Sequence, residues 1–247
     1  EARCCFAFAP TVELMRRGGG DAVAQRAREI VERQVAHMAR LIDDLLDVSR
    51  IARGRVQLRP EPLDLGDVVR QSVESYRPAL AAAGVTLDVT LPDAPVPVLG
   101  DATRLAQVVG NLLHNAAKFT PRGGAVRVAL AREGETAGVT VTDTGIGIPA
   151  TLLPTLFEPF AQGEQSLDRA HGGLGLGLAL VKGLTEMHAG RVAVRSEGAG
   201  TGATFTVTLP SPAALAPATP GAVAGPGAPA SPMRVLIVED NVDAAEM

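Results

Sequence analysis

The chain of 247 residues is long enough for one or two compact domains, and its 46% of hydrophobic residues can form a sizeable core. Because only 3% of the residues are aromatic and none is Trp, Ala, Val and Leu must build most of that core. The net charge of −4 argues against nucleic acid or an anionic membrane as a partner. The adjacent Cys4 and Cys5 are the only cysteines, which argues against a disulfide framework and a cysteine-rich metal site.

The sequence contains no apolar run of the roughly 18 residues that a membrane span needs. Its first residues also lack the basic-then-apolar order of a signal peptide. We therefore expect a cytoplasmic chain, or the cytoplasmic part of a membrane-anchored protein, with no direct membrane contact in this segment.

Residues 1–59 are predicted to be helical. Gly18 to Asp21 indicate a turn between two helices, with Asp21 as the N-cap of the second, and Gly54 is a plausible stop. The second helix carries apolar residues at alternating intervals of four and three, which is typical of a helical bundle or coiled coil. These seam residues are Val31, Val35, Met38, Ile42 and Leu45.

Residues 60–210 mix helical and strand periodicity without a strict strand–helix–strand alternation, which predicts an α+β domain with helices on one face of a sheet. Gly84 should end the first helix, Asp101 should cap the second and Gly190 should lie at the end of the third. The helices are expected within residues 63–84, 101–119 and 176–190. The strands are expected within residues 85–91, 125–130, 138–143, 191–197 and 203–210.

The last two segments differ sharply from this domain. Residues 211–232 are uncharged and rich in Ala, Pro and Gly, which predicts an extended linker. Residues 233–247 begin with an apolar run that the acidic pair Glu239 and Asp240 follows, as in a buried strand that leads into a loop.

Three constellations could carry chemistry. Asn111 and Asn115 share a helix face and Lys118 lies near it, so two amides and an ammonium could meet a polyphosphate with Mg²⁺, although solvated Asn residues would look the same. The segment 143–149, DTGIGIP, could place a carboxylate and an exposed backbone beside a ligand, or form an ordinary turn. The segment 171–178, HGGLGLGL, enters a helix, where backbone N–H groups could bind an anion.

These segments, with FEPF at residues 157–160 between the last two, resemble the N, G1, F and G2 boxes of the histidine kinases in order and in spacing. The resemblance implies the Bergerat (GHKL) fold, a sandwich of a mixed sheet and helices, with ATP and Mg²⁺ as its ligands. It covers residues 28 to 210 and includes the late segment GTGATFTVTLP.

The resemblance also implies roles for single residues. Asn115 would be the main Mg²⁺ ligand with Asn111 in support, Lys118 would contact phosphate and Asp143 would accept the adenine amine. Residues 161–172 would form a mobile lid. The remaining nucleotide-binding residues would be Gly145 and Gly147 at the adenine, Phe157 and Phe160 as anchors of the lid, Gly173, Leu174, Gly175, Leu176 and Gly177 at the triphosphate, and Thr204.

Asn111 distinguishes two chemistries within this superfamily. In ATPase relatives such as gyrase the corresponding residue is typically a Glu that activates water. Because an amide cannot act as a general base near neutral pH, Asn111 favours phosphoryl transfer to a protein side chain over hydrolysis.

The N-terminal helices resemble the dimerisation and phosphotransfer hairpin of the same family, which implies a homodimer through a four-helix bundle. That hairpin carries its phosphoacceptor His in a motif HELRxPL. Here the corresponding position is Cys5 or Ala2, depending on which proline Pro10 matches, so no acceptor occupies it. His37 on the second helix is a weaker candidate.

Residues 233–247 resemble the start of a response-regulator receiver domain, in which Glu239 and Asp240 would bind Mg²⁺. Together these resemblances suggest a hybrid sensor histidine kinase that passes the γ-phosphoryl group of ATP to a His and then to a receiver Asp, in its own chain or in a separate one. The alternative is a non-catalytic module that binds ATP and regulates a partner, because the acceptor His is absent.

Overall fold

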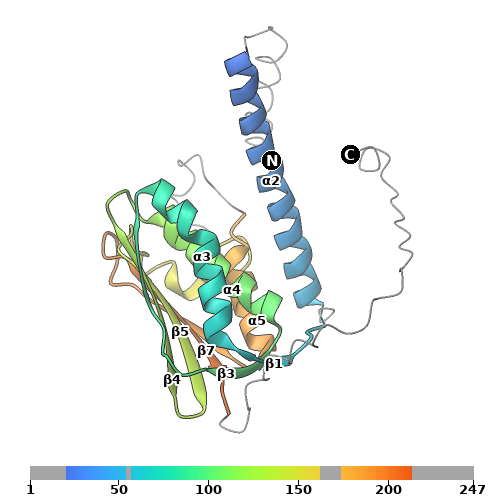
Figure 1. The fold of residues 1–247 in the computed structure, drawn as a ribbon, viewed down its shortest axis with the longest axis vertical. Helices are drawn as coiled ribbons and strands as arrows, with labels where there is room; N and C mark the ends of the chain where they lie inside the picture. Colours follow the sequence, from blue (N-terminus) through green and yellow to red (C-terminus); the bar gives the residue numbers. More distant parts are fainter. Residues whose placement is uncertain (1–20, 54–56, 162–173, 213–247) are drawn as a thin grey trace, which may run out of the picture. The chain divides into compact units, whose positions relative to one another are not determined.

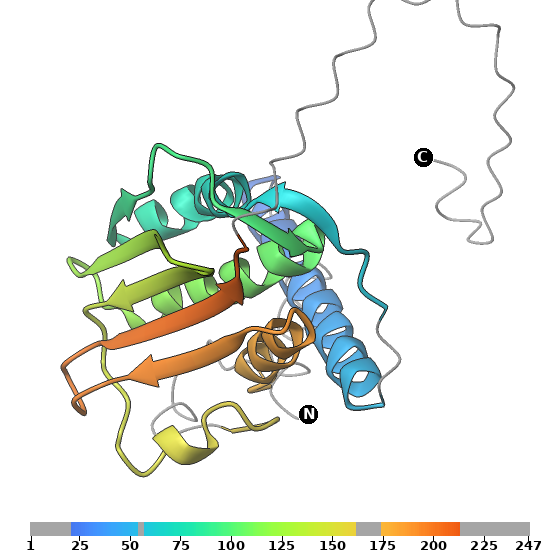
Figure 2. The ribbon, with the colours of Figure 1, turned by 90° about the horizontal axis from the view of Figure 1, so that it is seen from below.

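The computed structural model describes residues 21–53, 57–161 and 174–212. Five strands form a mixed sheet in the order β2-β4-β5-β7-β6, in which β2 and β4 are parallel and all other neighbours are antiparallel. Helices α3, α4 and α5 cover one face of this sheet (Figures 1 and 2). The strands are β2 (Thr86–Thr90), β4 (Ala125–Glu133), β5 (Thr136–Asp143), β6 (Arg191–Arg195) and β7 (Ala203–Pro210); the helices are α3 (Leu65–Ala83), α4 (Ala102–Phe119) and α5 (Gly177–Met187).

The core lies between the sheet and these three helices, and the strand alternation explains why. In β5 and β7 every second side chain is apolar and buried, and threonines occupy most of the positions between them. Because neighbouring residues of a strand point to opposite faces, this pattern directs one apolar face towards the helices. The buried residues of the two strands include Ala137, Val139, Val141, Phe205, Val207 and Leu209. The predicted α+β sandwich with helices on one face is confirmed.

The helix ends follow the predicted capping residues. The Asp101 carboxylate accepts a hydrogen bond from the backbone N–H of Arg104 at 3.2 Å and so caps α4. Gly84 ends α3 with a φ of 71°, a left-handed conformation that glycine adopts without strain. Asp64 caps α3 and also accepts from the N–H of Val96 at 2.9 Å, which joins the helix start to a distant loop.

Three short elements were not predicted. β1 (Glu61–Asp64) and β3 (Pro97–Gly100) pair antiparallel in a separate two-stranded sheet beside the main one. A single 3-10 turn, η1, spans Leu153–Thr155. Four-residue strands that contain proline give little periodic signal, so only their long-range pairing identifies them.

The end of α5 differs in detail from the expected glycine stop. Ala189, not Gly190, adopts the left-handed conformation, with a φ of 56°. At the neighbouring position 190 there is no room for a side chain. A Cβ atom on Gly190 would lie 2.4 Å from the carbonyl oxygen of Thr208 on β7. The glycine therefore allows the chain to turn closely against the sheet.

His188 has a structural role at the same helix end. Its ring is buried, Nδ1 lies 2.7 Å from the carbonyl oxygen of Leu184 and Nε2 accepts from the N–H of Asp101 at 3.0 Å. The imidazole thus links the end of α5 to the residue that caps α4.

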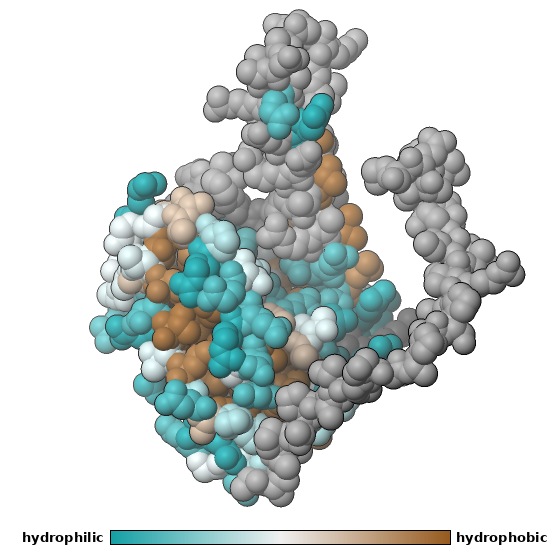
Figure 3. All heavy atoms as spheres, viewed as in Figure 1, coloured by the Kyte–Doolittle hydropathy of each residue, from teal (hydrophilic) through white to brown (hydrophobic). Residues whose placement is uncertain are grey.

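Helix α2 (Asp21–Ala52) contains the predicted seam. Val35, Ile42 and Leu45 are 50%, 57% and 44% exposed, and apolar side chains are visible along this helix in Figure 3. The expected stop at Gly54, the preceding turn at Gly18 and the first predicted helix lie outside the described residues.

The last turns of α2 contact the main domain. The Asp47 carboxylate is buried and accepts from Arg104 Nη1 at 2.8 Å and from Gln107 Nε2 at 3.0 Å, both on α4. A Cβ atom on Gly183 of α5 would lie 2.8 Å from Ile51, so the absence of a side chain there admits Ile51. α2 is thus attached to two of the helices that carry the predicted site.

The domain ends in a well-anchored residue. Ser211 is fully buried. Its N–H donates to the carbonyl oxygen of Glu135 and its hydroxyl donates to the carbonyl oxygen of Pro97, each over 2.7 Å. The predicted linker from residue 213 onward and the acidic pair Glu239 and Asp240 lie outside the described residues.

Candidate nucleotide-binding site

Helix α4 carries the first predicted motif. Asn111 and Asn115 are both half-buried on this helix, and the Nδ2 atom of Asn111 is buried without a hydrogen-bond partner among the described residues. A buried amide donor without a partner is costly unless a ligand or water accepts from it. This atom is therefore suited to meet an acceptor such as a phosphate oxygen.

Lys118 is near the C-terminal end of the same helix. Its Nζ atom lies 4.7 Å from the centre of the Phe119 ring, a cation–π geometry. Burial lowers the pKa of the Lys118 ammonium, because desolvation disfavours its charged form. An anionic ligand beside it would stabilise the charged form, as expected of a phosphate contact.

Asp143 ends strand β5 and is 8% exposed. Its Oδ1 accepts from the backbone N–H of Gly145 at 2.8 Å. Burial raises the pKa of Asp143 above its usual range, and the backbone hydrogen bonds from Gly145 and Ala203 offset this only in part. The result is a desolvated acceptor at a strand end, which suits an amino group on a base.

The glycines after Asp143 are needed because other backbone lies against them. A Cβ atom on Gly145 would lie 2.5 Å from the carbonyl oxygen of Phe119, the last residue of α4. Gly147 has a φ of 69°, and its Cβ would lie 1.9 Å from the carbonyl oxygen of Gly198. The segment 143–149 is therefore packed between the end of α4 and the β6–β7 connection.

The glycine-rich segment reaches Asn111. A Cβ atom on Gly177 would lie 3.6 Å from Asn111 Oδ1, so the first turn of α5 adjoins the Asn face of α4. Among the described residues, no side chain caps the N-terminus of α5, so its first backbone N–H groups can meet an anion. Leu176 is buried whereas Leu174 is 39% exposed, and Gly173 lies outside the described residues.

The residues that flank the predicted lid, Phe160 before it and Gly175 after it, are hydrogen-bonded to each other. The N–H of Phe160 donates to the carbonyl oxygen of Gly175 at 3.1 Å, while the lid itself, apart from Ala161, lies outside the described residues. Phe157 packs against the core, as an anchor would. Phe160 has a φ of 67° and its side chain is 61% exposed, so its anchoring contact comes from the backbone.

Thr204 is placed by the sheet itself. It lies on β7 opposite Thr142 of β5, and the two hydroxyl oxygens are 3.1 Å apart. Sequence reasoning missed the loop at residues 196–202, which packs on the 143–149 segment. The only signal for it was the late GTG at its end.

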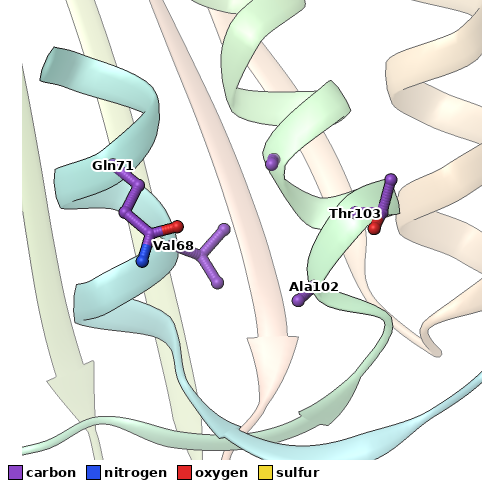
Figure 4. Close-up of a pocket in the computed structure, with 5 residues that line it drawn as sticks. Val68, Gln71, Ala102 and Thr103 are labelled. Atoms are coloured by element: carbon purple, nitrogen blue, oxygen red, sulfur yellow. The ribbon is translucent and has the colours of Figure 1, made fainter. Parts of the chain in front are cut away.

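A separate shallow pocket of about 300 Å³ lies between α3 and α4 (Figure 4). It is lined by Val68, Gln71, Ala102, Thr103 and Ala106. None of the predicted site residues lines this pocket, so it is distinct from the site that the motifs form.

Among the described residues, no group of three or more His, Cys, Asp or Glu side chains could hold a metal ion. A Mg²⁺ ion at the site that the motifs form would therefore need amide and phosphate oxygens as ligands.

Comparisons with known proteins identify the family. Residues 100–213 match the family described as histidine kinase-, DNA gyrase B- and HSP90-like ATPase. The circadian input-output histidine kinase CikA of Synechococcus elongatus is 39% identical over 186 residues, which are 74% of this chain and 24% of that protein.

Solved structures give the same result. Full-length ShkA in complex with AMPPNP matches with a TM-score of 0.67 and 28% identity, over 85% of this chain and 43% of that one. The mycobacterial sensor histidine kinase MprB matches with a TM-score of 0.53 and 34% identity, over 62% of this chain and 98% of that one.

The chain spans about a quarter of the length of CikA. Within the described residues, no helix is both long and apolar enough to cross a membrane. The match to the family model, the identity to CikA and the fold of MprB all point to one assignment: the chain belongs to the histidine kinase family, and residues 100–213 match the family's ATP-binding domain.

Proposed function

We propose that this chain is the catalytic part of a histidine kinase in a two-component phosphorelay, and that ATP with Mg²⁺ binds between α4, the 143–149 segment and the start of α5. The observation that carries the proposal is the meeting of Asn111 and Gly177. It combines a buried amide donor without a partner among the described residues with an uncapped helix N-terminus. Both groups favour a negatively charged ligand with several acceptor oxygens.

The triphosphate would lie along this junction. Asn111 Nδ2 would donate to a phosphate oxygen, and the first N–H groups of α5 would neutralise further negative charge. The ammonium of Lys118, whose pKa burial lowers, would be stabilised in its charged form by the phosphates. When bound, Mg²⁺ supplies charge neutralisation at the phosphates, and Asn115 is the residue proposed to hold it through its amide oxygen.

The adenine would be read by Asp143. A buried carboxylate accepts strongly from an amino group because little water competes for it. Gly145 and Gly147 let the 143–149 segment pack closely against the end of α4 and the β6–β7 connection, which would hold that segment in place beside the adenine. Thr204 on the neighbouring strand is the further nucleotide contact that we propose.

The proposal of transfer rather than hydrolysis rests on the amide at position 111. Asn111 takes the place at which an ATPase would hold a carboxylate to activate water, and an amide cannot accept a proton near neutral pH. The γ-phosphoryl group would instead pass to an imidazole nitrogen, so that a P–N bond forms while the bond to the ADP oxygen breaks. Catalysis would then consist mainly of positioning and charge neutralisation.

The exposed seam of α2 supports the proposed homodimer. Val35, Ile42 and Leu45 are at least 44% exposed at seam spacing, and a second copy of the hairpin would cover them. We propose that residues 1–59 form this hairpin, 60–210 the catalytic domain, 211–232 a linker and 233–247 the start of a receiver domain. A receiver domain, in this chain or in another, would be the partner that takes the phosphoryl group from His.

A labelling experiment tests the proposal. The chain is incubated with γ-labelled ATP and Mg²⁺, alone and with a separate hairpin polypeptide that carries the acceptor His. We expect acid-labile, base-stable label on the added hairpin, and none when Asn115→Ala replaces the wild type. ATP binding without any labelled polypeptide would favour the regulatory module, and steady release of phosphate would favour an ATPase.

A further inference from the structure

The β6–β7 connection, residues 196–202, forms a support for the segment that follows Asp143. The N–H of Gly200 donates to the carbonyl oxygen of Ile146 at 2.7 Å, and the N–H of Gly202 donates to the carbonyl oxygen of Gly145 at 3.1 Å. The contact is close, because a Cβ atom on Gly202 would lie 2.0 Å from the carbonyl oxygen of Asp143. The two segments therefore cannot shift independently of each other.

Ser196 joins these two segments with one hydroxyl group. Its Oγ accepts from the N–H of Ile148 at 2.9 Å and donates to the carbonyl oxygen of Gly202 at 2.6 Å. One bond thus holds the end of the 143–149 segment, and the other holds the residue just before Ala203. A hydroxyl can do both because it is donor and acceptor at once.

The Asp143 carboxylate depends on both of these segments. Its Oδ1 accepts from the N–H of Gly145 in the 143–149 segment, and Asp143 lies opposite Ala203, the first residue after the 196–202 loop, in the β5–β7 ladder. Without the Gly145 bond the carboxylate could rotate about its side-chain bonds and would lose its fixed direction. The orientation of the acceptor is therefore set by the relative position of the two segments that Ser196 bridges.

We infer that Ser196 is a positioning residue for adenine recognition: it fixes the direction of the Asp143 carboxylate without contacting the nucleotide. This inference rests on the proposed function, because it takes Asp143 as the acceptor of the adenine amine. It predicts that loss of the Ser196 hydroxyl reduces the preference for a base with a 6-amino group. Weaker binding of every nucleotide would instead indicate a merely structural role.

The experiment compares two ligands by equilibrium titration of the full chain with Mg²⁺. ATP carries the amine, and purine riboside triphosphate carries hydrogen in its place. Because a hydrogen bond to a charged acceptor is a strong one, the wild type should prefer ATP by ~10-fold or more. In Ser196→Ala the preference should fall to ~3-fold or less, while Ser196→Thr, which retains a hydroxyl, should restore it.

Thr201→Ala is the matched control. Thr201 lies in the same loop, and its hydroxyl donates to Gly198 at 2.8 Å without bridging to the 143–149 segment. This variant should keep the wild-type preference. Should Ser196→Ala not fold, Ser196→Cys keeps a similar volume but hydrogen-bonds weakly, and its preference should lie between those of Thr and Ala.

The outcomes separate the two levels of the argument. A wild type that prefers ATP together with a Ser196→Ala or Ser196→Cys variant of unchanged preference overturns the inference alone. A wild type that binds both ligands equally overturns the role of Asp143 and the inference with it. A reduced preference in Thr201→Ala equal to that in Ser196→Ala also overturns the inference, because the effect would then belong to the loop as a whole.

Discussion

Asp143→Asn should have opposite effects on stability and on ATP binding. Burial raises the pKa of this carboxyl, so ionisation at neutral pH costs the folded state free energy, by ~1.4 kcal/mol for each unit of the shift. Asn has the same shape, carries no charge and can still accept from the N–H of Gly145. The variant should therefore be at least as stable as the wild type at pH 7.

The pH dependence gives the sign of this effect. A folded pKa above the unfolded value means that the contribution to stability is fully present below the unfolded pKa, near 3.9 for Asp, and is lost as the pH rises through the folded value. Asp143→Asn has no such loss. The difference in unfolding free energy between the variant and the wild type should grow from acid to neutral pH and then level off.

ATP binding should fall in the same variant. The hydrogen bond from the adenine amine to a charged acceptor is worth ~1.5–3 kcal/mol, which corresponds to a ~10- to 150-fold loss of affinity. Chemical denaturation at several pH values gives the stabilities, and titration with ATP gives the affinities. A variant that is clearly less stable than the wild type at pH 7, or one that binds ATP as tightly, would refute the reasoning.

Two further experiments test the geometry. Gly147→Ala should abolish ATP binding, because its Cβ would lie 1.9 Å from the carbonyl oxygen of Gly198. Gly134→Ala shares the positive φ but has nothing within 4 Å of its Cβ, so it should keep ATP binding. Titration of both variants with ATP checks this, and equal affinities would contradict it. A double-mutant cycle of Asp47→Ala and Arg104→Ala should give a coupling of ~1–3 kcal/mol by chemical denaturation, because both side chains are mostly buried, at 11% and 26% exposure; a coupling near zero would show that α2 is not held there.

Local signals account for the parts of the fold that the sequence predicted. Asp101 and Gly84 act through caps within a few residues of themselves, and the threonine-interrupted runs of β5 and β7 are strong two-residue periodicities. The motifs on α4, after β5 and at the start of α5 could also be recognised in the sequence, because each has an unusual composition over a short span. Their roles in nucleotide binding stay predictions until ligands are measured.

Long-range contacts account for what was missed. β1 and β3 are four residues each and become strands only through pairing with each other across the α3 segment. The structural role of His188 depends on Asp101, which is 87 residues away in the sequence. The bridging role of Ser196 likewise depends on Ile148, 48 residues away. No window of sequence around these residues carries that information.

The central claim is that α4, the segment after Asp143 and the start of α5 form one site for ATP with Mg²⁺. Titration of the chain with ATP, with and without Mg²⁺, tests it most directly when Asn115→Ala and Asn115→Asp are compared with the wild type. Mg²⁺ should strengthen binding by the wild type and by Asn115→Asp, which keeps an oxygen ligand, but not by Asn115→Ala. Binding by the wild type that ignores Mg²⁺, or an equal response to Mg²⁺ in Asn115→Ala, would contradict the account.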